Sequence, residues 1–215
     1  ATYRIARTVF NEVALRCDYF LDCHGSDIGE DQFPNVIVPA AGDPDTDAKA
    51  EAMARAVGTE FIRRLDLTTP DATRGTFAGE VIRRGIPAMI TEIGGHGRYT
   101  EEEIDLQNRA AVNVLRHVGV LKGDPEPLEA FSEQKIFNWP AQSYRVVTGV
   151  GGSYHRRVGP RSPVKRGDLL AEIKDEWGEV IESFYSQHDA VVRLVNPWRI
   201  VKPGDSLMNL FRLEG

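Results

Sequence analysis

The chain has 215 residues, of which 41% are hydrophobic and 27% are charged, so it is long enough to bury a sizeable core. Its formal net charge is -6 at pH 7 and no run of Lys and Arg stands out, which argues against nucleic acids and membranes as partners. Two cysteines are too few for a disulfide framework, and no apolar run approaches the ~20 residues of a transmembrane helix, so we expect a cytoplasmic protein.

Helix and strand patterns alternate through the first part of the chain. In order, they predict a helix over 1–16, strands over 18–23 and 35–39, a helix over 43–58, a short helix over 75–85, a strand over 86–93 and a helix over 100–119. Strands that alternate with helices favour a largely parallel sheet flanked by helices. We therefore expect an α/β fold.

The helix over 100–119 has the clearest signals. Thr100 and Glu103 form a capping-box pattern at its start, and Gly119 is a typical C-terminal stop. Apolar side chains at helical spacing predict its buried face, made of Ile104, Ala111, Leu115 and Val118.

The second part of the chain has a different texture. Residues 121–130 are rich in Pro and acidic side chains, and the strand signals beyond them are short and punctuated by Gly and Pro. The pattern V-K-x-G-D-x-L occurs near 164–170 and again near 201–208, which predicts a small all-β unit with two related halves. We therefore expect an α/β domain over 1–120, a linker over 121–134 and a β domain over 135–215.

Two polar residues follow apolar strands in the first part. His24 comes directly after the strand over 18–23, and Glu92 ends an apolar run just before two glycines. If these strands are parallel, an imidazole and a carboxylate meet at one edge of the sheet, where ligands of such sheets bind. An imidazole can hold zinc, and a nearby carboxylate can take a proton from water. The alternatives are a polar loop or cap residue for His24 and a salt-bridged strand end for Glu92.

His96 and Arg98 follow Glu92 closely in the stretch GGHGRY. A guanidinium suits the two oxygens of a carboxylate, so both side chains are candidates for substrate binding. A solvated loop is the alternative interpretation.

Several stretches in order resemble the succinylglutamate desuccinylase/aspartoacylase family. They are CDYFLDCHGSD, then GIPAMITEIGGHGRYTEEEIDLQNRAAVNVLRHVGVLKG, then VKRGDLLAEIKDEWGEVI, DAVVRLV and VKPGDSL. The resemblance implies a zinc-dependent amidohydrolase with a carboxypeptidase-like α/β domain followed by a small barrel-sandwich-like β domain. It also implies a small N-acyl amino acid-like substrate, and it is compatible with assembly of the chain into a homo-oligomer.

The resemblance also implies roles for individual residues. His24, in the stretch Asp22-Cys23-His24, matches the family's third zinc ligand, and Asp22 would orient its imidazole. Glu92 matches the general base, which takes a proton from a zinc-bound water that attacks the amide carbonyl. The family's β domain can contribute a substrate-binding side chain, for which Tyr154 is our candidate.

The sequence departs from the family at the other zinc ligands. None of the five histidines has Glu three residues later, so the family's His-x-x-Glu motif is absent. The family's Asn-Arg substrate motif, which in the family also precedes the His24 region, has no counterpart ahead of His24 here. Zinc sites need about three protein ligands. We expect the remaining ligands on a segment that precedes Ala1, and a degenerate site is the alternative.

These observations predict a zinc-dependent deacylase that acts on an N-acyl amino acid or related small amide. One alternative is a non-catalytic binding protein on a degenerate hydrolase scaffold. Another is a biotinyl/lipoyl-like carrier or adaptor module, in which Lys174 would carry the covalently attached group, although no Met-Lys-Met surrounds that residue.

Overall fold

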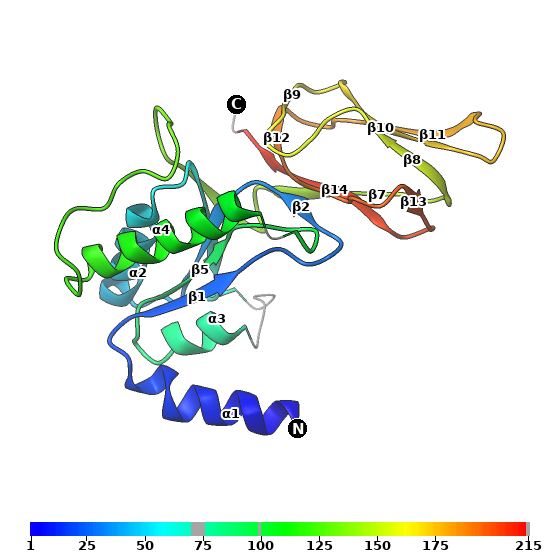
Figure 1. Cartoon of the computed structure of the whole chain (residues 1–215). Helices are drawn as coiled ribbons and strands as arrows, with labels where there is room; N and C mark the ends of the chain where they lie inside the picture. Colours follow the sequence, from blue (N-terminus) through cyan, green and yellow to red (C-terminus); the bar gives the residue numbers. More distant parts are fainter. Residues whose placement is uncertain (70–75, 99, 214–215) are drawn as a thin grey trace. The chain divides into compact units, whose positions relative to one another are not determined.

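The computed structural model describes residues 1–69, 76–98 and 100–213 (Figure 1). The chain splits into two compact units, and each is described by itself. The α/β unit comprises Ala1–His24, Pro34–Ile93 and Thr100–Trp139. The β unit comprises Gly25–Phe33, Gly94–Tyr99 and Pro140–Gly215.

The α/β unit is built on a five-stranded sheet in the order β1-β5-β3-β4-β6. Three neighbouring pairs are parallel, and the β3–β5 pair is antiparallel, so the predicted largely parallel sheet is confirmed. The strands are β1 (Phe20–His24), β3 (Asn35–Ala40), β4 (Phe61–Asp66), β5 (Ala88–Glu92) and β6 (Lys135–Trp139).

Helices cover both faces of this sheet, as the alternating pattern predicts. Figure 1 shows α2 and α4 on one side of β1 and β5 and α3 on the other. The helices are α1 (Thr2–Glu12), the 3-10 turn η1 (Ala14–Arg16), α2 (Pro44–Val57), α3 (Phe77–Ile82) and α4 (Glu101–His117). The first residue of the helix predicted over 75–85, Gly75, lies outside the described residues.

The ends of α2 and α4 follow from their capping residues. The Asp43 carboxylate accepts the N–H of Thr46 at 2.9 Å, and Gly58 ends α2 in the left-handed conformation at a φ of 86°. The predicted capping box of α4 is confirmed, because Thr100 and Glu103 each accept a backbone N–H from the other.

The predicted buried face of α4 is wrong for Ile104 and Leu115, whereas Val118 is partly buried and packs against the core. Ile104 is 50% exposed and Leu115 is 37% exposed, whereas the buried side chains are those of Ala110, Asn113 and Val114. The physical reason is that α4 packs against α2, and the face that it buries there is shifted around the helix from the one that the apolar spacing predicts.

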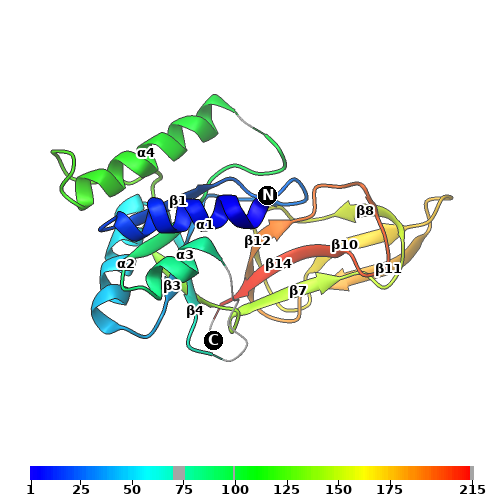
Figure 2. The same cartoon turned by 90° about the horizontal axis from the view of Figure 1, so that it is seen from below.

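The β unit consists of two antiparallel sheets, with strand orders β11-β10-β8-β13 and β2-β12-β14-β7. Figure 2 shows β7 and β14, which are hydrogen-bonded, side by side. The strands are β2 (Asp31–Gln32), β7 (Ser143–Val147), β8 (Gly152–Arg156), β9 (Pro163–Val164), β10 (Leu169–Lys174), β11 (Val180–Tyr185), β12 (Ala190–Val195), β13 (Ile200–Val201) and β14 (Ser206–Arg212).

The strands of the β unit form two halves, one around each copy of the sequence repeat. The first half has β8, β9 and β10, and the second has β12, β13 and β14. In the first half, β8 pairs with β10 and with β13 of the second half. In the second half, β12 pairs with β14 and with β9 of the first half. The predicted β unit of two related halves is therefore confirmed.

The division between the units differs from a simple cut of the sequence. β6 joins the α/β sheet through β4, and the segments that follow β1 and β5 belong to the β unit. The domain limits expected over 1–120 and 135–215 stay a prediction. No helix in the described part of the chain has the length and apolar character that a membrane span needs.

Candidate functional site

Two strand ends of the α/β unit place a histidine beside a glutamate. β1 and β5 run parallel, and their register pairs His24 with Glu92 at the carboxyl end of both strands. This is the edge of a parallel pair at which ligands bind. On the other side of β5, β3 places the buried Asn35 opposite Glu92. Glu92 therefore lies between an imidazole and a carboxamide.

The side chains of Asp22, His24 and Glu92 lie on one face of the sheet, because paired residues share a face and alternate residues point the same way. His24 Nε2 lies 3.1 Å from Asp22 Oδ1, and His24 Nδ1 lies 3.9 Å from Glu92 Oε1. The second distance is too long for a hydrogen bond. Asp22 can therefore hold one ring nitrogen while the other faces Glu92.

The three groups differ in their contact with solvent. The Glu92 side chain is 14% exposed, the Asp22 side chain 25% and the His24 side chain 47%. A carboxylate that is largely shielded from water and close to an imidazole has the environment of a general base. The arrangement can hold a metal through His24 and accept a proton at Glu92.

Asn35 is the neighbour that the sequence did not single out. It is fully buried at the start of β3, and it faces Glu92 through the antiparallel β3–β5 pair. The available signal is a polar residue that opens the apolar stretch NVIVP, a position where an apolar side chain would ordinarily be expected.

His96 and Arg98 belong to the β unit, where each has its own contacts. His96 has a φ of 55°, its Nδ1 lies 3.1 Å from the carbonyl oxygen of Ile28, and its ring meets the Trp198 ring edge-on at 5.5 Å. Arg98 Nη1 donates to Asp31 Oδ1 at 3.1 Å. Both side chains are thus held by fixed contacts, and their role in substrate binding stays a prediction.

Tyr154 lies inside the β unit. Its side chain is 7% exposed, and its hydroxyl donates to the carbonyl oxygen of Leu207 at 3.2 Å. Burial raises the pKa of Tyr154 well above its usual range. A phenol that is buried and already donates to the backbone is poorly placed to receive a substrate, so we leave it out of the site that we propose.

Comparison with known proteins finds solved structures that share this fold. No family model matches the chain. The ectoine utilization protein EutE (DoeB) of Ruegeria pomeroyi superposes with a TM-score of 0.85 at 21% identity, covering 99% of this chain and 66% of that one. The succinylglutamate desuccinylase/aspartoacylase of Rhodobacter sphaeroides has a TM-score of 0.82 at 22% identity, covering 99% and 63%. By fold, the chain is similar to solved structures of the succinylglutamate desuccinylase/aspartoacylase family. The resemblance predicted from the sequence is confirmed.

A curated relative agrees with this assignment. The N-alpha-acetyl-L-2,4-diaminobutyric acid deacetylase of Halomonas elongata is 26% identical over 175 residues, covering 81% of this chain and 49% of the relative. The chain therefore spans about half the length of that relative and under two thirds of the Rhodobacter desuccinylase/aspartoacylase structure.

A zinc ligand is the role that the sequence predicts for His24. Across residues 1–69, 76–98 and 100–213, however, no group of three or more His, Cys, Asp or Glu side chains is placed to hold a metal ion. Since a zinc site needs about three protein ligands, the described residues do not complete one by themselves. Zinc stays a proposal.

The structure bears on the carrier alternative through Lys174. This residue is the last of β10, where it pairs with Ser153 and Val180, and is not in the turn that joins β10 to β11 at the tip of the hairpin. The tip carries Trp177, which is 78% exposed. A carrier module presents its modified lysine at such a tip, so the position of Lys174 argues against covalent carriage.

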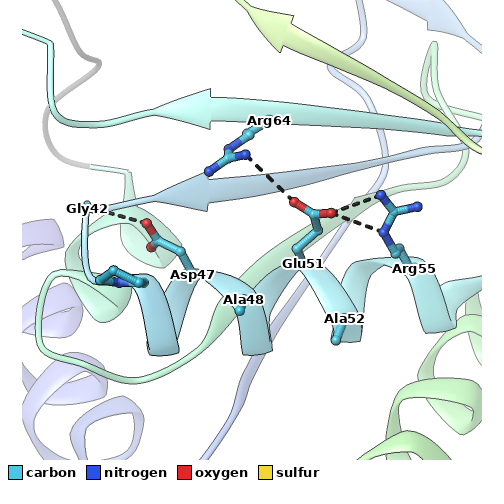
Figure 3. Close-up of a pocket in the computed structure, with 8 residues that line it drawn as sticks. Gly42, Asp47, Ala48, Glu51, Ala52, Arg55 and Arg64 are labelled. Atoms are coloured by element: carbon cyan, nitrogen blue, oxygen red, sulfur yellow. Dashed lines mark hydrogen bonds and ion pairs between the residues drawn. The ribbon is translucent and has the colours of Figure 1, made fainter.

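A separate pocket of about 590 Å³ lies against α2 in the α/β unit. Figure 3 shows Glu51 between two arginines: it accepts from Arg55 Nε and Nη2 at 3.1 and 2.9 Å, and Arg64 Nη1 lies 3.9 Å away. The Asp47 carboxylate accepts the N–H of Gly42 at 2.9 Å. These charged groups engage one another and the backbone, so we assign the pocket a structural role.

Proposed function

We propose that this protein is a zinc-dependent deacylase that hydrolyses the amide bond of an N-acyl amino acid or a related small amide. The observation that carries the proposal is the register of β1 and β5, which sets His24 beside Glu92 at the carboxyl end of both strands. In this proposal His24 is a metal ligand, Glu92 is the general base, and Asp22 orients the imidazole.

Each residue has a task that follows from its environment. Asp22 Oδ1, 3.1 Å from His24 Nε2, fixes the ring and leaves Nδ1 as the ligating nitrogen. Glu92 is shielded enough to take a proton from the attacking water and return it to the leaving amine. Zinc, when bound, polarises the amide carbonyl and lowers the pKa of water.

The names of the relatives support the substrate class. One relative is named for the deacetylation of an N-acetylated diamino acid, and EutE (DoeB) of Ruegeria pomeroyi has also been solved with a bound product. We therefore propose an N-acyl amino acid as substrate, with His96 and Arg98 as candidate partners for its carboxylate.

The zinc site requires ligands in addition to His24. In a complete site other residues supply these ligands, and the alternative is a degenerate site that binds without catalysis. The two differ in one observable, because a degenerate site would not hold stoichiometric zinc through His24.

The test is zinc content and hydrolysis of N-acetyl-2,4-diaminobutyrate, measured on the full-length natural protein. Wild type should hold about one zinc per chain, and His24→Ala should lose both zinc and activity. The matched control is His117→Ala, which removes an exposed imidazole at the end of α4 and should change neither. Unchanged zinc content in His24→Ala would remove His24 from the metal site.

A further inference from the structure

Two turns of the β unit share one sequence pattern and one backbone geometry. Each reads V-K-x-G-D, over 164–168 and over 201–205. In both, the Asp carboxylate accepts the N–H of the Lys at 2.8 Å, and the Gly has a positive φ, 94° at Gly167 and 90° at Gly204. The sequence repeat is therefore a structural repeat.

The same correspondence holds for the strands that meet these turns. Gly167 donates its N–H to the carbonyl of the buried Ser186 at 2.8 Å, and the Gly of the second turn donates to the buried Thr148 at 2.8 Å. The Ser186 hydroxyl lies 2.6 Å from the carbonyl oxygen of His188, and the Thr148 hydroxyl lies 2.8 Å from that of Val150. Comparison of the two turns therefore shows which residues their shared backbone geometry requires.

The two turns differ in charge. Asp189 Oδ1 accepts the N–H of Arg166 at 2.9 Å in the first turn, a bond that a proline cannot make. The second turn keeps the same geometry although it has no charged residue at the positions of Arg166 and Asp189, so the fold does not require these two charges. The residues of the first turn and their counterparts in the second are Arg166 and Pro203, His188 and Val150, and Asp189 and Gly151.

A cavity of about 610 Å³ is lined by Arg166, His188 and Asp189, together with Arg212 from β14. Arg212 Nη2 donates to the carbonyl oxygen of Ala141. Within the part of the chain that the structure describes, neither Arg166 nor Arg212 forms an ion pair, and Asp189 is the one carboxylate that lines the cavity. The cavity is therefore lined by two arginines and a histidine but by only one residue with a carboxylate.

We propose that this cavity binds a compact oxyanion, a carboxylate or phosphate group held by Arg166, Arg212 and His188. A guanidinium matches two oxygens of such a group with parallel hydrogen bonds, and the imidazole of His188 can add a third donor. The cavity lies wholly in the β unit, so the proposal does not depend on the proposed deacylase activity.

The test is calorimetric titration of the whole protein with inorganic phosphate and, separately, with succinate, at constant ionic strength set by chloride. We expect saturable one-site binding of at least one of them, and the preferred ion distinguishes a phosphate from a carboxylate ligand. The double variant Arg166→Pro with His188→Val installs the residues of the second turn, so it should fold. It should bind at least about tenfold more weakly, the effect of losing charge-assisted hydrogen bonds.

Two further variants make the result decisive. Arg166→Ala repeats the test without proline and should weaken binding in the same direction. Lys202→Ala removes one positive charge from the other turn and should leave binding unchanged, because Lys202 does not line the cavity. The proposal is overturned if wild type shows no saturable binding of either ion, or if Lys202→Ala weakens binding as much as Arg166→Ala.

Discussion

Asn113 offers a sharp test of what holds the α/β unit together. Its side chain is 2% exposed on α4 and makes three hydrogen bonds. Nδ2 donates to the carbonyl oxygens of Val57 at 3.0 Å and Glu126 at 2.6 Å, and Oδ1 accepts the N–H of Glu126 at 3.0 Å. One amide thus joins the end of α2 to the chain that follows α4.

The expected effect of Asn113→Ala follows from these contacts. The substitution removes all three bonds and leaves the buried carbonyl of Val57 without this donor, which together costs about 2–3 kcal/mol of unfolding free energy. Asn108→Ala is the matched control, because it makes the same change on the exposed side of α4 and gains the same helix propensity.

The assay is urea unfolding followed by circular dichroism, with the free energy in water compared between the two variants. Asn113→Ala should unfold at clearly lower urea than Asn108→Ala with a similar m value. Equal midpoints for the two variants would refute the reasoning, since the three bonds would then contribute nothing net.

Two further stability predictions concern the ends of α2. Gly58→Ala should lower the free energy of unfolding in urea more than Gly85→Ala. Both glycines have a positive φ, but only at Gly58 would the added Cβ clash with backbone, since it would lie 2.8 Å from the Cα of Pro127. Equal losses for the two variants would contradict this clash. Hydrogen bonds from Thr46 lower the pKa of Asp43, so its stabilising effect is present above its ordinary value of 3.8 and is lost as the pH falls through the lowered pKa. The difference in Tm between wild type and Asp43→Ala should therefore be full at pH 7 and shrink under acid, and a pH-independent difference would exclude the carboxylate as the cause.

Part of the structure could be predicted because it depends on local patterns. Strands that stop at a polar residue, helices with caps and the V-K-x-G-D repeat are all encoded within short stretches, and the parallel β1–β5 pair then brings His24 beside Glu92. β4 was not singled out, because Arg63 and Arg64 interrupt its apolar pattern although Arg63 is buried over the Trp139 ring.

Other features depend on contacts between distant segments. The buried face of α4 is decided by its packing against α2, which apolar spacing within one helix cannot reveal. The cavity of the β unit likewise combines Arg166, His188 and Arg212 from three separate stretches, so no motif marks it. Asn35 can be placed opposite Glu92 only once it is known that β3 runs antiparallel to β5.

The central claim is that Glu92 is the general base of an N-acyl amino acid deacylase. The most direct measurement is the turnover of N-acetyl-2,4-diaminobutyrate by the Glu92→Gln variant of the full-length natural protein, with zinc content determined on the same samples. The account predicts that zinc is retained while kcat falls by about a hundredfold to ten-thousandfold, the usual contribution of a general base. Glu102→Gln, an exposed change in the first turn of α4, should leave kcat unchanged. A Glu92→Gln variant with wild-type kcat would contradict the account.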